Sequence, residues 1–127
     1  MANKSETGKK AFNDGHRAES AAALFLRLKG YGILEKNFKP PRGTGAGEID
    51  LIAKKGKTVV FVEVKRRQTT DAAAESVSET VKQRRIRGAE YFLSLHPEFE
   101  GFDMRFDVIL MAPKRFPTHI QNAFISE

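Results

Sequence analysis

Three ionisable side chains in two neighbouring apolar segments have the types and spacing that a metal-dependent hydrolase requires. Asp50 lies in the segment GEIDLIA, and Glu63 and Lys65 lie in the segment VVFVEVK. Burying a carboxylate among apolar neighbours costs several kcal/mol unless a cation or strong hydrogen-bond donors compensate for it. Two such carboxylates facing each other would also repel, which favours a bound divalent metal between them.

The register of these two segments follows from the turn that joins them. Both segments are rich in Ile, Val and Phe, as strands are, and the residues KKGK between them are typical of a tight turn. If Gly56 and Lys57 form a two-residue loop, with glycine first as a type II′ turn prefers, Asp50 lies directly opposite Glu63. Side chains alternate between faces along a strand, so we expect Lys65 on the face of Glu63.

The simplest alternative is an exposed hairpin face on which Glu and Lys pair across strands without any catalytic role. The surrounding residues argue against it. The segment that leads to Glu63 is apolar on both faces, and Asp50 lies between Ile49 and Leu51. Such strands are typical of the covered centre of a sheet.

Length and composition set the broad class of the protein. A chain of 127 residues fits one domain, expected at residues 11–127 after a disordered lead-in at residues 1–10. The absence of cysteine excludes a disulfide scaffold, a thiolate zinc site and a cysteine nucleophile, and it fits the reducing cytoplasm. We expect no membrane segment, because no apolar stretch approaches the ~20 residues that a bilayer span needs. The net charge of +6 favours a polyanionic partner such as nucleic acid.

A first helix is expected over about residues 11–29, before Gly30. Its predicted core stripe consists of Ala21, Leu24, Phe25 and Leu28.

Glu19 is the unusual residue of this helix. Its neighbours three, four and seven residues later are Ala22, Ala23 and Leu26, which places Glu19 at the edge of a buried face. Two interpretations stay open. Glu19 either reaches water or a capping partner at this boundary, or it is a third acidic group directed at the site.

The remaining elements follow from turn residues and periodicity. A strand over residues 31–39 leads into the loop PPRGTGAG, which precedes a strand and therefore cannot be a helix-opening phosphate loop. Ser76 and Glu79 form a capping box that predicts a second helix to about Leu95. Two more strands are expected, over residues 104–111 and 119–125, and Asp107 in the first of them is interpreted as a structural partner. The three histidines are scattered without the spacing of a zinc site.

Basic residues concentrate around the proposed site and are candidates for contacts with a nucleic-acid backbone. Lys82 and Arg85 fall on the apolar side of the second helix, where they either extend aliphatic stems over the core or contact phosphate at the rim of the site. The candidate nucleic-acid-binding residues are Arg42, Arg66, Arg67, Lys82 and Arg85.

The order helix, three strands, helix, strand, with Asp on the second strand and Glu-x-Lys on the third, resembles the restriction-endonuclease-like fold and its PD-(D/E)xK motif. That resemblance implies an α/β fold with a mixed central sheet flanked by helices, in the order αβββαβ(β). Within this superfamily the segments GEIDLIA, FVEVK and RFDV are similar to those of the YraN family. That family comprises small bacterial proteins of poorly defined function that are similar to archaeal-type Holliday junction resolvases. The similarity covers roughly residues 11–125, and one departure is Ile49 in place of the usual proline.

By this resemblance Asp50, Glu63, Lys65 and Glu19 are the catalytic residues. The metal ligands would be Asp50, Glu63 and the Val64 carbonyl, holding Mg²⁺ or Mn²⁺ for phosphodiester hydrolysis. Lys65 would orient or deprotonate the attacking water, or stabilise charge that develops on the phosphate.

The expected partner is nucleic acid, with DNA favoured over RNA and branched DNA as one candidate substrate. A non-catalytic nucleic-acid-binding module on a nuclease scaffold is the alternative function, because fold does not fix activity. A homodimer is compatible with the sequence, although no clear dimer stripe is evident.

Overall fold

The structure is a computed structural model that describes residues 17–66 and 78–124. It begins with an N-terminal helix, of which residues 17–28 are described. The elements that follow are β1 (Gly32–Phe38), β2 (Ile49–Lys55), β3 (Thr58–Arg66), α2 (Glu79–Ser94), the short 3-10 helix η2 (Pro97–Phe99), β4 (Asp103–Met111) and β5 (Thr118–Phe124). The predicted α/β class and element order are confirmed. The expected lead-in at residues 1–10, the start of the first helix before residue 17, and Arg67 lie outside the described residues.

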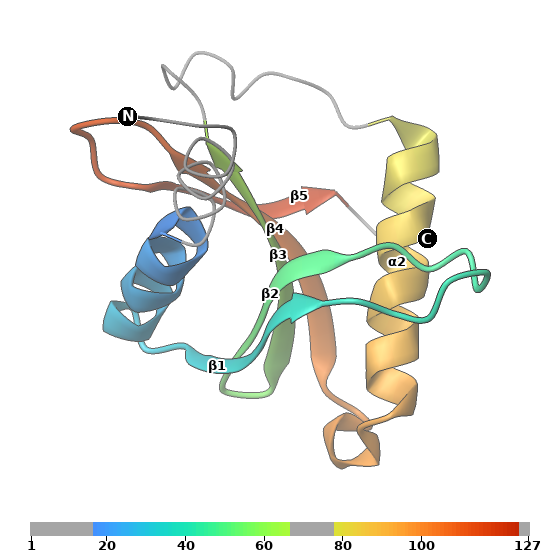
Figure 1. Cartoon of the computed structure of the whole chain (residues 1–127). Helices are drawn as coiled ribbons and strands as arrows, with labels where there is room; N and C mark the ends of the chain where they lie inside the picture. The colour runs from blue at the N-terminus through green and yellow to red at the C-terminus, as the bar shows by residue number, and fades with distance from the viewer. Residues whose placement is uncertain (1–16, 67–77, 125–127) are drawn as a thin grey trace, which may run out of the picture.

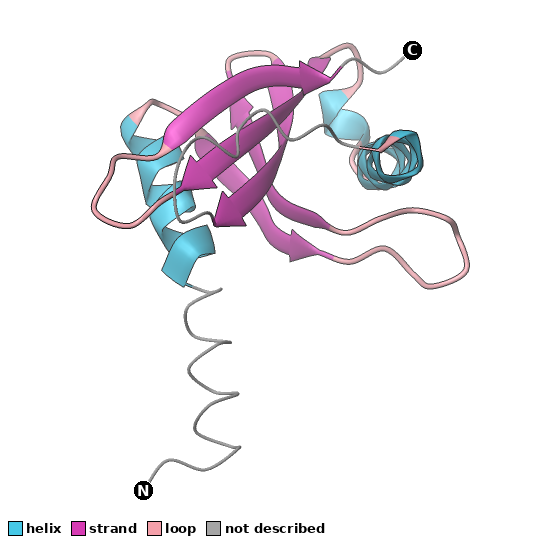
Figure 2. Cartoon of the chain, turned by 90° about the horizontal axis from the view of Figure 1, so that it is seen from above, coloured by secondary structure: helices cyan, strands magenta, loops and turns pink. Residues whose placement is uncertain are grey.

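The five strands form one mixed sheet in the order β1-β2-β3-β4-β5. Only β3 and β4 run parallel, and α2 provides the crossover between them; the other neighbours are antiparallel. The N-terminal helix and α2 lie on opposite sides of this sheet (Figure 1), and the view from above shows the same arrangement (Figure 2). Among the described residues, no helix has the length and apolarity needed to cross a membrane.

The β2–β3 hairpin has the register that its turn predicts. Lys55 pairs with Thr58, and the ladder continues in step to Leu51 opposite Val62. Gly56 has a φ of 60°, whereas Lys57 does not adopt positive φ. This combination is typical of a type II′ turn, in which only the first loop residue needs the left-handed conformation. The turn at one end of the hairpin therefore sets which side chains meet at the other end.

The N-terminal helix packs through a different stripe from the one predicted. Ala22, Ala23 and Leu26 are fully buried against one face of the sheet, whereas Leu24 and Leu28 are 55% and 79% exposed. The expectation that Leu24 and Leu28 lie in the core is therefore wrong, and so is that for Ala21, which is exposed. Residues 21–26 are all apolar, so periodicity alone cannot choose a face, and the two alanines allow the helix to approach the sheet closely. The stripe that packs is the one that continues from Glu19.

The second core lies between α2 and the other face of the sheet. It contains Ile86, Ala89 and Phe92 of α2, packed with apolar side chains of β2, β3 and β4. The helix begins later than the predicted capping box at Ser76. Ser78 is the N-cap, and its hydroxyl accepts a hydrogen bond from the Val81 amide at 3.3 Å. The helix ends with Leu95 as its C-cap, as expected.

Candidate active site

Asp50 and Glu63 meet where the β2–β3 ladder ends. The last pair of this ladder joins Leu51 to Val62, so Asp50 and Glu63 are the next residues in register. The Val64 amide donates a hydrogen bond to Asp50 Oδ2 at 2.9 Å. The Asp50 side chain thus takes an amide that a continued ladder would have bonded to the β2 backbone, which holds this carboxylate beside β3.

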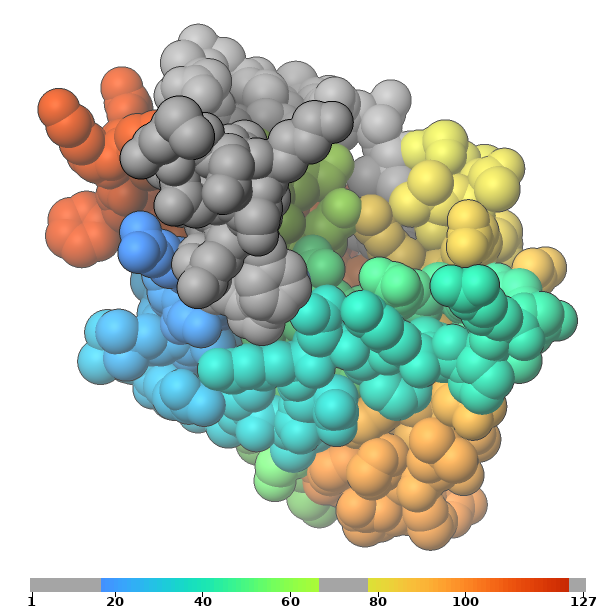
Figure 3. All heavy atoms as spheres, viewed as in Figure 1, coloured from blue at the N-terminus to red at the C-terminus, as the bar shows by residue number. Residues whose placement is uncertain are grey.

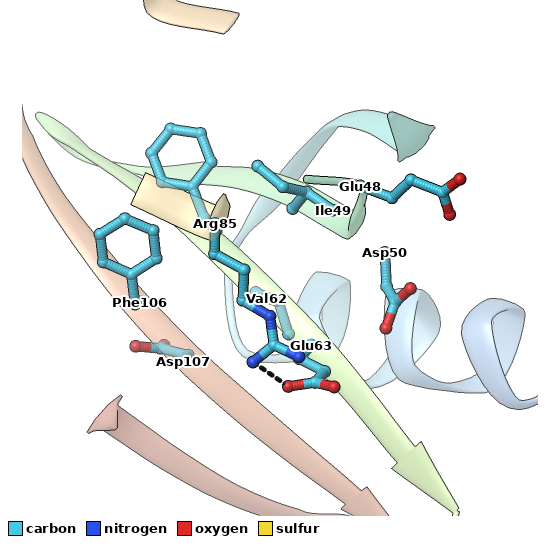
Figure 4. Close-up of a pocket in the computed structure, with 9 residues that line it drawn as sticks. Glu48, Ile49, Asp50, Val62, Glu63, Arg85, Phe106 and Asp107 are labelled. Carbon is cyan, nitrogen blue, oxygen red and sulfur yellow. Dashed lines mark ion pairs between the residues drawn. The ribbon is translucent and has the colours of Figure 1, made fainter. Parts of the chain in front are cut away.

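The two carboxylates line a hollow of about 380 Å³ that is open to solvent. Figure 4 shows the carboxylate of Glu48 directed away from those of Asp50 and Glu63. Lys65 lies two residues after Glu63 on β3. It is half-buried and interacts with another group of the protein. The residues that line the hollow are Glu48, Ile49, Asp50, Phe61, Val62, Glu63, Arg85, Phe106 and Asp107.

Arg85 enters this hollow from α2 and pairs with Glu63. Its Nη1 atom contacts Glu63 Oε2, drawn as the dashed line in Figure 4, and the two side chains are 19% and 22% exposed. Both of these atoms are buried and lack a partner with hydrogen-bond geometry among the described residues. The two side chains therefore pair through their opposite charges.

A close contact between two glycines positions Arg85. The Gly47 amide donates to the Arg84 carbonyl of α2 at 2.7 Å, just before β2 begins. A Cβ atom added at Gly88 would overlap the Gly47 carbonyl oxygen, so only glycine permits this approach. The space-filling view shows the loop before β2 lying against α2 (Figure 3). Arg85 is held in the turn of helix between these contacts and is thereby brought to Glu63.

Asp50 is an electrostatically strained carboxylate. Burial raises its pKa above the ordinary value of 3.8, and the neighbouring charge of Glu63 raises it further. The Val64 hydrogen bond and the charge of Arg85 act in the opposite direction but do not outweigh burial. A cation that bound here would relieve this cost.

The donor set fits a hard divalent cation, which prefers oxygen ligands. Asp50 carries a raised pKa and Glu63 is a second carboxylate in the same hollow, so both can use a metal as a partner. Within the described part of the chain, no three His, Cys, Asp or Glu side chains gather as metal ligands would. Glu19 is half-buried on the N-terminal helix, which packs on the opposite face of the sheet from α2. The structure does not bring Glu19 into one cluster with the other two.

The candidate nucleic-acid-binding residues lie in different settings. Arg42 is exposed in the loop before β2, Arg66 is exposed at the end of β3, and Lys82 is half-buried in the first turn of α2. Arg85 lies inside the hollow instead of at its rim. The sequence interpretation missed both the Arg85–Glu63 pair and the glycine contact, although an interior helix glycine such as Gly88 was an available signal.

Asp107 has the structural role that was predicted for it. Its carboxylate accepts hydrogen bonds from Arg105 at 2.8 Å, from His119 Nε2 at 2.7 Å and from the Asn122 amide at 2.9 Å. Arg105 also donates to the Tyr31 hydroxyl at 2.6 Å, which ties β4 to the start of β1. Figure 4 shows the Asp107 carboxylate turned away from Asp50 and Glu63.

Comparison with known proteins gives one consistent result. The model of the uncharacterised protein family UPF0102 matches residues 18–111. The chain is similar to UPF0102 proteins of three bacteria. It is 53% identical over 110 residues to that of Paramagnetospirillum magneticum, covering 87% of this chain and 85% of the relative. The identity is 43% over 118 residues for Parvibaculum lavamentivorans (93% and 86% covered) and 45% over 114 residues for Nitrobacter winogradskyi (90% and 93% covered).

Proposed function

We propose that this chain, which belongs to the UPF0102 family, hydrolyses phosphodiester bonds of nucleic acid with a divalent metal held by Asp50 and Glu63. The observation that carries the proposal is the meeting of these two carboxylates, one with a raised pKa, in a solvent-open hollow at the end of the β2–β3 ladder. In a pair of carboxylates with a purely structural role, hydrogen bonds or cations would be expected to offset the cost of burial. A carboxylate with a perturbed pKa in an open hollow is more typical of a functional site.

Each residue of the site would have a distinct role in hydrolysis. Asp50, Glu63 and the Val64 carbonyl would hold Mg²⁺ or Mn²⁺, hard cations that prefer oxygen ligands. Such a metal, when bound, polarises a phosphate and lowers the pKa of water. Lys65, on the face of Glu63, would orient the attacking water or stabilise the negative charge that develops on the phosphate. Arg42, Arg66 and Lys82 would contact the backbone without reading its sequence.

DNA is the proposed substrate, and branched DNA is the structure of first choice for a test. The net charge of +6 supports a polyanionic partner, and the exposed side chains of Arg42 and Arg66 could contact its backbone. These features hold equally for RNA, which therefore belongs in the same panel.

A non-catalytic nucleic-acid-binding module is the second candidate, and one observation favours it. Arg85 already neutralises Glu63, so the carboxylate has a resident cation without any metal. A protein that uses the scaffold only to bind would need no more than this.

A cleavage panel separates the two candidates. Branched, duplex and single-stranded DNA and RNA are incubated with Mg²⁺, Mn²⁺ or EDTA. The wild type should cut at least one substrate with metal and none with EDTA. Glu63→Gln should abolish cutting, whereas Glu90→Gln, which removes an exposed carboxylate of α2 that does not line the hollow, should not. Binding without cutting under every metal condition would establish the non-catalytic module instead.

A further inference from the structure

We infer that Arg85 competes with the divalent metal for Glu63 and, once displaced, binds a phosphate of the nucleic acid in the same hollow. Arg85 would thus be a positioning residue that couples metal binding to substrate binding. The inference rests on the proposed function and deepens it by naming how the site passes from the metal-free to the loaded state.

Competition follows from the atoms involved. Arg85 Nη1 occupies Glu63 Oε2, an oxygen that a metal ligand would use, and this oxygen has no hydrogen bond of good geometry. A guanidinium and a divalent cation on one carboxylate would repel each other strongly in a partly desolvated hollow. The metal and the guanidinium would therefore compete for this oxygen.

The guanidinium of Arg85, once displaced from Glu63, can turn to another position in the hollow. The backbone of α2 is fixed beside β2 by the contact of Gly47 with Arg84 and Gly88, so only the long Arg85 side chain needs to turn. The hollow that it lines is open to solvent. A planar guanidinium binds phosphate through two parallel hydrogen bonds, which suits a backbone phosphate brought to the metal.

The other arginines of this helix turn do not have the same option. Arg84 and Arg87 are exposed, and neither lines the hollow. Arg84 therefore provides a matched control, because its replacement removes the same charge from the same turn of α2 without touching Glu63.

Binding couplings are reciprocal, so the exchange of Arg85 for a metal ion on Glu63 predicts two effects of removing Arg85. Removing Arg85 should strengthen metal binding to the free protein, since the competitor is gone. It should also weaken DNA binding more when metal is present than when it is absent, since in the metal-free protein the guanidinium is held by Glu63 and makes no phosphate contact.

The experiment uses the full chain as wild type, Arg85→Met and Arg84→Met. Calorimetry with Mn²⁺ should show Arg85→Met binding at least about five-fold more tightly than the wild type, the lower end of typical coupling energies. Fluorescence anisotropy with a labelled DNA duplex is then measured in EDTA and in Ca²⁺. Arg85→Met should lose no more affinity than Arg84→Met in EDTA, where only a charge is removed, and about five-fold more than Arg84→Met in Ca²⁺. Arg84→Met should lower DNA affinity equally in both.

The outcomes separate this inference from the proposed function. If wild type and Arg85→Met bind Mn²⁺ equally, and Asp50→Asn with Glu63→Gln abolishes that binding, the metal site stands and the competition is overturned. An equal loss of DNA affinity in EDTA and Ca²⁺ also overturns it. If no form binds Mn²⁺, the proposed function and this inference fail together. Should Arg85→Met not fold, Arg85→Gln removes the charge while keeping a polar side chain and should bind Mn²⁺ more tightly than the wild type, and equal or weaker binding overturns the competition.

Discussion

Asp50 and Asp107 are carboxylates on two strands of one sheet, and their surroundings differ in a way that separates function from structure. Burial would raise the pKa of Asp107, but hydrogen bonds from His119, Arg105 and the Asn122 amide outweigh it and lower the pKa. Burial also raises the pKa of Asp50, and there one backbone amide and the charge of Arg85 do not compensate for it.

The comparison shows how the surroundings of a structural carboxylate differ from those of a candidate metal ligand. Asp107 is surrounded by hydrogen-bond donors from β4 and β5, and its hydrogen bond with Arg105 also raises the pKa of Arg105. Asp50 instead lies beside a like charge, that of Glu63, and lines an open hollow. A carboxylate left in that state has capacity for a further cation, which is the property that a metal site requires.

The largest expected effect comes from removing the satisfied carboxylate. Asp107→Ala leaves Arg105, His119 and the Asn122 amide without their acceptor in a buried setting. We expect a loss of about 3–5 kcal/mol in the free energy of unfolding, measured by urea denaturation. Asp103→Ala, at the exposed start of the same strand, is the control and should be close to neutral. A loss below about 1 kcal/mol in Asp107→Ala would contradict the structural assignment.

Lys65 tests the other side of the comparison through rate instead of stability. Under the proposed function, Lys65→Ala should slow cleavage by about 100-fold or more, because its contribution arises mainly in the transition state. DNA affinity should stay within about two-fold of the wild type. Lys57→Ala, in the β2–β3 turn, provides the matched loss of charge. If Lys65→Ala weakened binding and left the rate of the bound complex unchanged, Lys65 would belong with the backbone-binding residues.

Gly88 tests whether the position of Arg85 depends on the close approach of α2 to β2. Gly88→Ala places a methyl group against the Gly47 carbonyl, and overpacking of this kind costs about 1–3 kcal/mol. We expect that loss in thermal or urea unfolding, together with altered Mn²⁺ affinity because Arg85 moves relative to Glu63. Gly32→Ala is the control, since an added Cβ there makes only ordinary contact at 3.9 Å with the Lys54 carbonyl. Equal stability of the two variants would show that α2 can shift freely.

The smallest expected effect is the pH dependence of the two carboxylates, which should have opposite signs. The raised pKa of Asp50 means that the folded metal-free protein loses stability as pH rises above 3.8 toward the folded pKa. Asp50→Asn should therefore gain stability over the wild type as pH rises from 3.8 to neutral, by less than about 1 kcal/mol because water screens this partly buried group.

Asp107 should behave in the reverse manner. Its lowered pKa adds stability that is fully present above 3.8 and is lost as pH falls through the folded pKa. Unfolding curves of wild type, Asp50→Asn and Asp107→Asn across this range measure both signs. The same sign for both carboxylates would remove the distinction between the two regions.

The order of residues along the chain was enough to predict the elements, the register of the β2–β3 hairpin and the meeting of Asp50 with Glu63. These follow from interactions that are local along the chain: strand-forming residues, a two-residue turn and the alternation of side chains. It also identified Asp107 as structural and placed Glu19 on the edge of a buried stripe. It chose the wrong core stripe for the N-terminal helix, because six consecutive apolar residues fit more than one face.

Which charges reach the site depends instead on how α2 and the N-terminal helix pack on the sheet. Arg85 is distant in sequence from Glu63, and its pairing depends on the approach of α2 to β2 through Gly47 and Gly88. Glu19 has a suitable residue type, but its helix packs on the other face of the sheet. Contacts of this kind are set by how helices pack on a sheet, and helix packing depends on side-chain shape and close backbone approach. The spacing of residues along the chain does not encode that information.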